Sequence, residues 1–160
     1  MITFPIDFNI LIYILHNKGY LRAYNVLDTL TIPANYSIMI NIPVSAKCYA
    51  IPYELRLIPD KDDAIDVRLY VDGNLILHDE NVKLVTWSRG FNLINDFRII
   101  LFVRERMTAI FTNKTSEDVN LILLFTWGEI REDIKAKIID KYFDAINKEL
   151  LGEKNENKKM

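Results

Sequence analysis

Cysteine and histidine are scarce in this sequence of 160 residues, which holds one cysteine and two histidines. Cys48 has no second cysteine with which to form a disulfide inside the chain. It also lacks the Cys and His companions that structural zinc requires. Because Cys48 lies in a strand-like run, we interpret it as a small apolar residue packed in the interior. No cofactor and no metal site is expected.

Signs of catalysis are missing as well. His16 and His78 are the only side chains whose ordinary pKa lies close enough to neutrality for a general base. His78 ends a predicted strand beside two acidic residues, and His16 lies where a helix would end, so neither position indicates a catalytic role. The sequence also has no glycine-rich phosphate loop. We predict that the protein is not an enzyme, and a deep pocket with converging carboxylates would argue against this prediction.

An excess of positive charge and a long apolar run are also absent. The formal net charge is −2, which provides no basic field for a phosphate backbone, so nucleic-acid binding is not expected. The densest apolar run, residues 10–15, is far shorter than the roughly 20 residues that span a bilayer. Residues 1–15 do not have the pattern of a secretory signal. We therefore expect no membrane span and, for a cellular protein, a location in the cytoplasm.

The composition is that of a packed globular chain, with 50% hydrophobic and 26% charged residues. Four segments differ in texture. An apolar N-terminal segment covers residues 1–19, a β domain covers residues 20–128, a helix covers residues 129–151, and a polar tail covers residues 152–160. The last segment is polar and has no apolar anchor, so alone it should be disordered.

Runs of β-branched and aromatic residues, separated by Pro, Asn, Asp and Gly, predict many short strands in the β domain. A hairpin is the clearest of these features, because Asp72-Gly73 between two alternating runs is typical of a type I′ turn. We expect an antiparallel β-sandwich or jelly roll, with a closed barrel as the alternative. The predicted strands are residues 21–31, 36–42, 48–57, 65–71, 75–78, 82–87, 97–104, 108–113 and 119–127.

Each end of the chain carries a predicted apolar element. Pro5 and Asp7 favour a short N-terminal helix that runs to His16 and ends at Gly19, although a strand is nearly as compatible with the pattern. At the other end, residues spaced by four predict an amphipathic α-helix from residue 129. Its stripe is expected to lie against the sheet or a neighbouring subunit. The candidate interaction residues on this stripe are Ile134, Ile138, Tyr142 and Ile146.

The turns and strands follow a recurring layout in the runs Thr31-Ile-Pro-Ala-Asn35, Ile40-Asn-Ile-Pro-Val44, Leu69-Tyr-Val-Asp-Gly-Asn-Leu75, Ile110-Phe-Thr-Asn-Lys-Thr115 and Phe125-Thr-Trp-Gly128. Over about residues 20–128 this layout is similar to small β-sandwich virion proteins of tailed phages and archaeal viruses. The resemblance implies a structural protein whose partners are copies of itself or other virion proteins. It implies no catalytic residues. The elements at the two ends depart from a minimal sandwich, which leaves the position in a virion open.

A second function remains open, that of a lectin-like module that binds a glycan. Several aromatic side chains could form a platform for sugar rings if they were exposed on one face of a sheet. Trp87 is the strongest candidate, since it meets the loop Ser88-Arg89-Gly90 and is expected to be partly exposed. The other aromatic candidates are Tyr49, Tyr53, Tyr70, Phe91 and Trp127.

Overall fold

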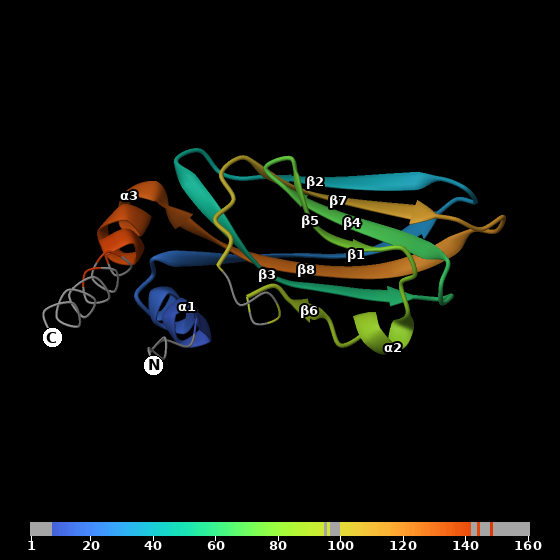
Figure 1. Ribbon diagram of the computed structural model, residues 1–160, viewed down its shortest axis with the longest axis horizontal. Helices are drawn as coiled ribbons and strands as arrows, with labels where there is room; N and C mark the ends of the chain where they lie inside the picture. The colour runs from blue at the N-terminus through green and yellow to red at the C-terminus, as the bar shows by residue number, and fades with distance from the viewer. Residues whose placement is uncertain (1–7, 95, 97–99, 142–143, 145–147, 149–160) are drawn as a thin grey trace, which may run out of the picture.

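Two antiparallel four-stranded sheets face each other in the computed structural model of this chain and form a β-sandwich (Figure 1). The structure describes residues 8–94, 96, 100–141, 144 and 148. Short helices lie at one end of the sandwich and along one side of it (Figure 1). The prediction of a mainly β chain with a two-sheet sandwich is confirmed.

The strands pair in a regular order. β1 lies beside β8, β2 beside β7, β3 beside β6, and β4 beside β5, so each pair of strand numbers adds up to nine. Pairing of β3 with β8 and of β4 with β7 completes the two sheets. The first sheet has the order β1-β8-β3-β6 and the second has the order β2-β7-β4-β5. The bounds are β1 (Leu21–Ile32), β2 (Ser37–Pro43), β3 (Cys48–Pro59), β4 (Ile65–Val71), β5 (Asn74–Asp79), β6 (Phe91–Asn92), β7 (Arg106–Asn113) and β8 (Val119–Arg131).

The β4–β5 hairpin forms as its sequence predicts. Ile65, Val67 and Leu69 alternate with more polar residues and are buried, which places one face of β4 in the core. Asp72 and Gly73 have φ angles of 48° and 80°, the pair of positive values that a type I′ turn requires. This turn sets the register of the hairpin.

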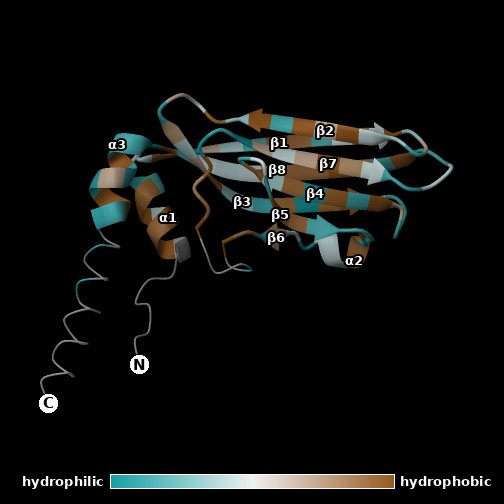
Figure 2. Cartoon of the chain, turned by 45° about the horizontal axis from the view of Figure 1, so that its top comes forward, coloured by the Kyte–Doolittle hydropathy of each residue, from teal (hydrophilic) through white to brown (hydrophobic). Residues whose placement is uncertain are grey.

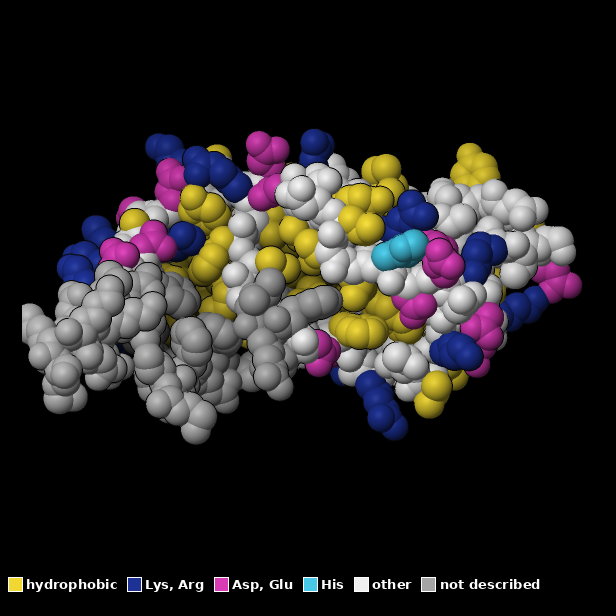
Figure 3. All heavy atoms as spheres, viewed as in Figure 1, with side chains coloured by type: hydrophobic (Ala, Val, Ile, Leu, Met, Phe, Trp, Pro, Cys, Tyr) yellow, Lys and Arg dark blue, Asp and Glu magenta, His cyan; other side chains and the backbone are white. Residues whose placement is uncertain are grey.

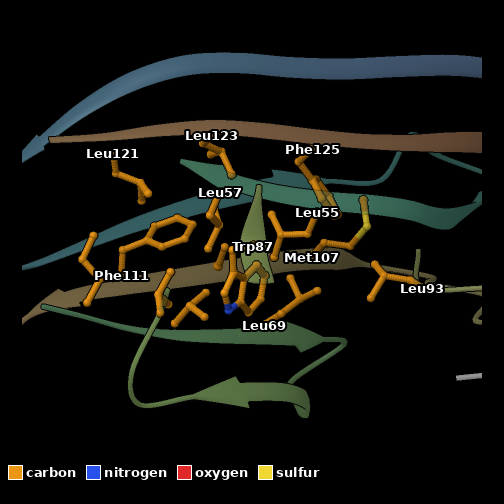
Figure 4. Packing of buried hydrophobic residues seen from close by; sticks show 14 of the residues in the cluster. Leu55, Leu57, Leu69, Trp87, Leu93, Met107, Phe111, Leu121, Leu123 and Phe125 are labelled. Atoms are coloured by element: carbon orange, nitrogen blue, oxygen red, sulfur yellow. The ribbon is translucent and has the colours of Figure 1, made fainter. Parts of the chain in front are cut away.

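The main core fills the space between the sheets (Figure 4). Side chains from both sheets meet there, and alternate residues along each strand point inward. On β8, for example, Leu121, Leu123 and Phe125 are buried, while the residues between them face the other side of the sheet. At the surface, hydrophobic side chains are visible between the two sheets, with charged side chains spread around them (Figure 3).

A second apolar cluster lies on the outer face of the first sheet, at one end. The helix α1 (Phe8–Asn17), the short helix α3 (Glu132–Ile134) and a π-helical segment (Lys135–Asp140) are found at this end (Figures 1 and 2). They bring apolar side chains against strand residues that point away from the main core. The buried members of this cluster are Leu15, Leu21, Ile51, Ile94, Ile130 and Ile139.

From Phe8 onward, where the structure describes it, the N-terminal segment is a helix and not a strand, while Pro5 and Asp7 lie outside the described residues. α1 is followed by Gly19, whose φ of 72° lies in the left-handed region that ends many helices. The backbone N–H of Tyr20 then donates to the carbonyl of Leu15 at 2.9 Å, which closes the end of the helix before β1 starts.

Two predicted strands are not found. Residues 82–87 were expected to be extended, but the structure has a helical turn, α2 (Leu84–Trp87), because the carboxylate of Asp62 accepts the N–H of Leu84 at 2.7 Å and so begins the turn. In the predicted strand 97–104, residues 97–99 lie outside the described residues. In the described residues 100–104, the β pairing is a single bridge between Val103 and Ala50, and no strand forms there.

The start of the C-terminal helix was also predicted wrongly. We expected the helix to begin at residue 129, yet β8 continues through Gly128 to Arg131 and the helix begins at Glu132. The strand continues because its backbone stays paired with both β1 and β3 up to Ile130. The polar residues Glu129 and Arg131 lie on the inner side of the first sheet, whereas Ile130 joins the second cluster.

Candidate functional site

Trp87 lies in the main core and does not line a surface loop. Its exposed fraction is 0%, and its indole Nε1 donates to a carboxylate oxygen of Asp79 at 2.8 Å. The ring packs against Phe91, with 4.4 Å between the two ring centroids. The expectation that Trp87 is partly exposed is therefore wrong, because the helical turn of α2 directs its side chain between the sheets.

The other aromatic candidates do not form an exposed platform either. Trp127 is buried and stacks with Tyr24, while Tyr70 and Phe91 are half-buried. Tyr49 and Tyr53 pack against the second cluster. Trp87, Phe91 and Trp127 therefore belong to the main core, Tyr49 and Tyr53 pack against the second cluster, and Tyr70 lies on the side of β4 that faces away from the core, so the six do not share one face of a sheet.

The C-terminal stripe lies partly against the second cluster. Ile134 and Ile138 are half-buried against it, and Ile139 from the same segment is one of its buried members. Tyr142 and Ile146 lie outside the described residues. The described part of the stripe thus contributes to the packing of the chain on its own first sheet.

α1 presents a second apolar face that points away from the sheet. Leu15 is buried and Leu11 and Ile12 pack beside it, whereas Ile10, Tyr13 and Ile14 are exposed, with Tyr13 66% exposed. The exposed residues are spaced by three and four and so share one side of the helix. The helix sequence FNILIYILHN contains no Asp, Glu, Lys or Arg. We call Ile10, Tyr13 and Ile14 the α1 face.

A further exposed apolar surface crosses the outer face of the first sheet. Leu27 on β1 lies opposite Leu124 on β8, and Ile122 on β8 lies opposite Ile58 on β3. Leu27 is 70% exposed, Ile58 and Ile122 are exposed as well, and Leu124 is half-buried. These four residues form the outer strip. Arg56 and Glu54, which form an ion pair at 2.8 Å, lie beside it on β3.

A groove of about 410 Å³ lies between the start of β1, the start of β3 and the end of β8. Arg22 and Glu129 are opposite each other on β1 and β8. Glu129 is largely buried and accepts the backbone N–H of Ser45 at 3.3 Å. The carboxylate thus ties the β2–β3 connection to β8. The groove is lined by Gly19, Tyr20, Arg22, Tyr24, Ser45, Cys48, Glu129, Arg131 and Ile134.

Cys48 faces this groove but is not an activated nucleophile. Burial, and to a lesser degree the nearby carboxylate of Glu129, raises the pKa of the Cys48 thiol. A thiol with a raised pKa remains protonated at neutral pH, whereas the thiolate is the reactive form. Cys48 is half-buried at the groove, so the expectation that it is packed in the interior is met only in part.

The two imidazoles bind neighbours that give no catalytic arrangement. Nε2 of His78 lies 2.9 Å from a carboxylate oxygen of Asp66, and Nε of Arg68 lies 3.4 Å from the same nitrogen. Nε2 of His16 lies 3.2 Å from the hydroxyl of Tyr53. Burial raises the pKa of Tyr53, so this phenol keeps its proton, and the tautomer of His16 decides which of the two groups donates. Among the described hydrogen bonds, neither imidazole engages a serine, threonine or cysteine.

Asn113 is a buried polar residue whose role the sequence did not reveal. Its Nδ2 donates to the backbone carbonyls of Ile32, Pro33 and Glu117, and its Oδ1 accepts from the backbone and hydroxyl of Thr115. The amide thereby joins the β1–β2 connection to the β7–β8 turn. Its only visible signal was a position at the start of a polar turn, which many exposed asparagines share.

In comparisons with known proteins, no protein-family model and no curated protein matches the chain. Across the described ranges, no three His, Cys, Asp or Glu side chains gather as a metal site would require. In the same part of the chain, no helix is both long and apolar enough to cross a bilayer. The α1 face and the outer strip remain as the candidate functional surfaces.

Proposed function

We propose that this chain is a non-enzymatic structural protein of a virion, which acts through contacts with copies of itself or with other virion proteins. The observation that carries the proposal is the exposure of the α1 face and the outer strip, since Tyr13 is 66% and Leu27 70% exposed. Both surfaces belong to the outer side of the first sheet. Exposed apolar side chains that lie together mark sites of protein–protein contact, whereas ones scattered singly are common on any protein surface.

The strand order supports a virion role. Pairs of strands whose numbers add up to nine arise when one long hairpin is rolled up, and we propose that the sandwich is a jelly roll. Jelly rolls are the architecture of many viral capsid domains, and of lectins as well. The fold alone therefore does not separate assembly from ligand binding, so the surfaces must decide.

The surfaces favour assembly over glycan binding. A lectin-like site would present aromatic rings to solvent, but Trp87 and Trp127 are buried and the remaining aromatic candidates are half-buried. The outer strip is instead aliphatic and nearly flat, because its members are neighbours on three adjacent strands. Flat aliphatic surfaces are suited to protein–protein contacts, in which apolar area at the centre is removed from water.

The assembly is tested by measuring molar mass at increasing concentration by light scattering and sedimentation. We expect the full chain to form oligomers, and Ile122→Lys and Tyr13→Lys each to weaken them, because each places a charge in an apolar contact. Asn41→Lys, on the outer face of the second sheet, is the matched control and should assemble as the parent does. A parent chain that stays monomeric at all concentrations would overturn the assembly role.

The virion part of the proposal has a separate test. Antibodies raised against the folded chain should label intact virus particles in electron micrographs, and the chain should sediment with the particles. Absence of the chain from purified particles would overturn the virion assignment while leaving the assembly role to the mass measurement.

A further inference from the structure

The free edge of β1 is a long, regular row of backbone groups. β1 has 12 residues and, within the described part of the chain, its strand partner is β8 on one side. The register with β8 runs from Leu21 opposite Ile130 to Ile32 opposite Val119 with no shift. The other side of β1 therefore presents a row of N–H and C=O groups that is a template for another strand; within β1, the N–H of Thr29 donates to the carboxylate of Asp28 at 2.8 Å.

The other described edges of the sandwich are short, bounded by Pro or irregular, whereas β1 is long and regular, and its edge is protected by the inward-facing charges of Arg22 and Asp28 alone. Natural edges are blunted by short length, by Pro or Lys, or by a bulge. β6 has two residues, β2 ends at Pro43, and the β4–β5 ladder has an irregularity after Leu69. The β1 sequence LRAYNVLDTLTI contains no Pro, Lys or Gly.

The charges of β1 are complementary to each other. Arg22 and Asp28 are its only charged residues, have opposite signs, and lie an even number of positions apart, so they share one face of the strand. If β1 were paired antiparallel with an identical strand, each arginine could lie opposite an aspartate of the other strand.

We propose that β1 pairs antiparallel with β1 of a second copy of this chain, about a two-fold axis that passes through Asn25. The inference rests on the proposed assembly function and names its partner and its first contact. Two residues lie opposite each other when their numbers add up to 50, so the overlap covers residues 21–29. Arg22 then lies opposite Asp28 of the second copy, and the half-buried Tyr24 lies opposite Val26, an aromatic and β-branched pair of the kind that stabilises sheets.

Neighbouring registers lose the charge pairing. With the axis at Val26, Arg22 lies opposite Leu30, and with the axis at Tyr24 it lies opposite Val26. The two-fold axis must pass through a residue and not between two residues. Only then does each outward-facing residue of β1 lie opposite an outward-facing residue of the second copy, so that the outer faces of both first sheets lie on the same side. The register centred on Asn25 is therefore the one that the charges select.

This register also joins the apolar surfaces of the two copies. Ala23 and Leu27 lie on the outer face, and each is opposite the other across the axis. The outer strips of both copies, which begin at Leu27, then flank the axis on one continuous sheet. The result is an isologous dimer with a flat apolar face that is available for further assembly.

A disulfide at the axis tests the register in the full chain. In a Cys48→Ser background, Asn25→Cys places two thiols on residues whose Cα atoms are about 4.5–5.5 Å apart across the strands, within the range of a disulfide. Thr29→Cys is the matched control, because it is exposed on the same face of β1, yet its two copies would lie about 26 Å apart. Under mild oxidation we expect a covalent dimer from Asn25→Cys and none from Thr29→Cys.

A charge exchange tests the same register by affinity. Arg22→Asp and Asp28→Arg should each weaken the dimer about tenfold, since each replaces two attractive pairs by repulsive ones. The double exchange should restore the parent affinity. Circular dichroism identifies any variant that fails to fold, and in that case the disulfide experiment decides.

The outcomes separate this inference from the proposed function. An oligomer by mass that gives no Asn25→Cys disulfide, or that crosslinks equally through Thr29→Cys, would overturn the β1 pairing and leave the assembly function standing. A monomer at every concentration would overturn both. A disulfide specific to Asn25→Cys, with affinity restored by the double exchange, would establish the pairing.

Discussion

The hydroxyl of Tyr53 occupies the space that a side chain on Gly128 would need. A Cβ on Gly128 would lie 1.9 Å from Tyr53 Oη and 2.7 Å from a methyl carbon of Leu21. The same hydroxyl binds His16 of α1 at 3.2 Å, so the glycine allows the helix to approach the first sheet. We expect Gly128→Ala to lower the free energy of unfolding by about 1 to 3 kcal/mol, measured in urea, because it overpacks this contact.

The same prediction can be checked by a double-mutant cycle. In a Tyr53→Ala background the phenol is gone, so Gly128→Ala should cost clearly less than it does in the parent chain. An equal cost in both backgrounds would mean that the close approach of Tyr53 is not what excludes a side chain at Gly128.

Asp72 links the β4–β5 turn to the segment before β7. Its carboxylate accepts the backbone N–H groups of Arg104, Glu105 and Arg106 at 2.7 to 3.1 Å. Burial alone would raise the pKa of Asp72, but these three hydrogen bonds together outweigh it, and the pKa lies below its ordinary value. The stabilisation is therefore present above the unfolded-state pKa, near about 4, and is lost as the pH falls through the lower folded-state value.

Asp72→Asn should isolate this effect, because asparagine keeps the positive φ of the turn but lacks the charge and one acceptor. We expect a loss of about 1 to 2 kcal/mol at pH 7, and a smaller difference from the parent as the pH is lowered below 4. Chemical unfolding at a series of pH values measures this. A difference that stays constant with pH would contradict the assigned cause.

The hydrogen bond between Trp87 and Asp79 predicts a cost for removing the carboxylate. Asp79→Ala would leave the buried indole N–H without its acceptor, which should lower the free energy of unfolding by about 1 to 3 kcal/mol. Glu80→Ala, which removes the next and exposed carboxylate, is the control and should change the stability by less than about 0.5 kcal/mol. Thermal unfolding followed by tryptophan fluorescence compares the two variants, and equal stabilities would refute the prediction.

Asn113→Asp should be strongly destabilising although the two side chains have nearly the same shape. The substitution would set a carboxylate against the three backbone carbonyls that the amide now donates to. We expect a loss of about 3 kcal/mol or more at pH 7, and a smaller loss at pH 4, where the new carboxyl can be protonated. The exposed Asn41→Asp, whose neighbour Thr108 donates to it, is the control and should be nearly neutral by urea unfolding.

Local sequence patterns were sufficient to predict the structure at positions where few residue types can adopt the required backbone conformation. Asp72-Gly73 predicted its turn because few other pairs adopt two positive φ angles, and the alternation of β4 predicted its buried face. Gly19 ended α1 for the same kind of reason. The N-terminal helix was chosen over a strand on these signals, and the structure confirms it.

Tertiary contacts decided the elements that the sequence could not predict. Residues 82–87 have strand-forming side chains, yet Asp62, 22 residues before Leu84, and Asp79, 8 residues before Trp87, hold them as a helical turn through hydrogen bonds. β8 continues past Gly128 because both neighbours remain paired with it, a fact that no window of local sequence contains. The outer strip likewise became visible only when the register placed Leu27, Ile58 and Ile122 on adjacent strands.

The pairing of the first strand with the last has a consequence for how the chain folds as it is made. β8 is the central neighbour of both β1 and β3, so the first sheet cannot close until residues 119–131 have left the ribosome. Until then β1 and β3 lack the strand that lies between them and pairs with both. Contacts so distant in sequence slow folding. The second sheet likewise waits for β7, which lies between β2 and β4, so before residues 106–131 are made the described strand pairs that can form are the β4–β5 hairpin and the short β3–β6 pair.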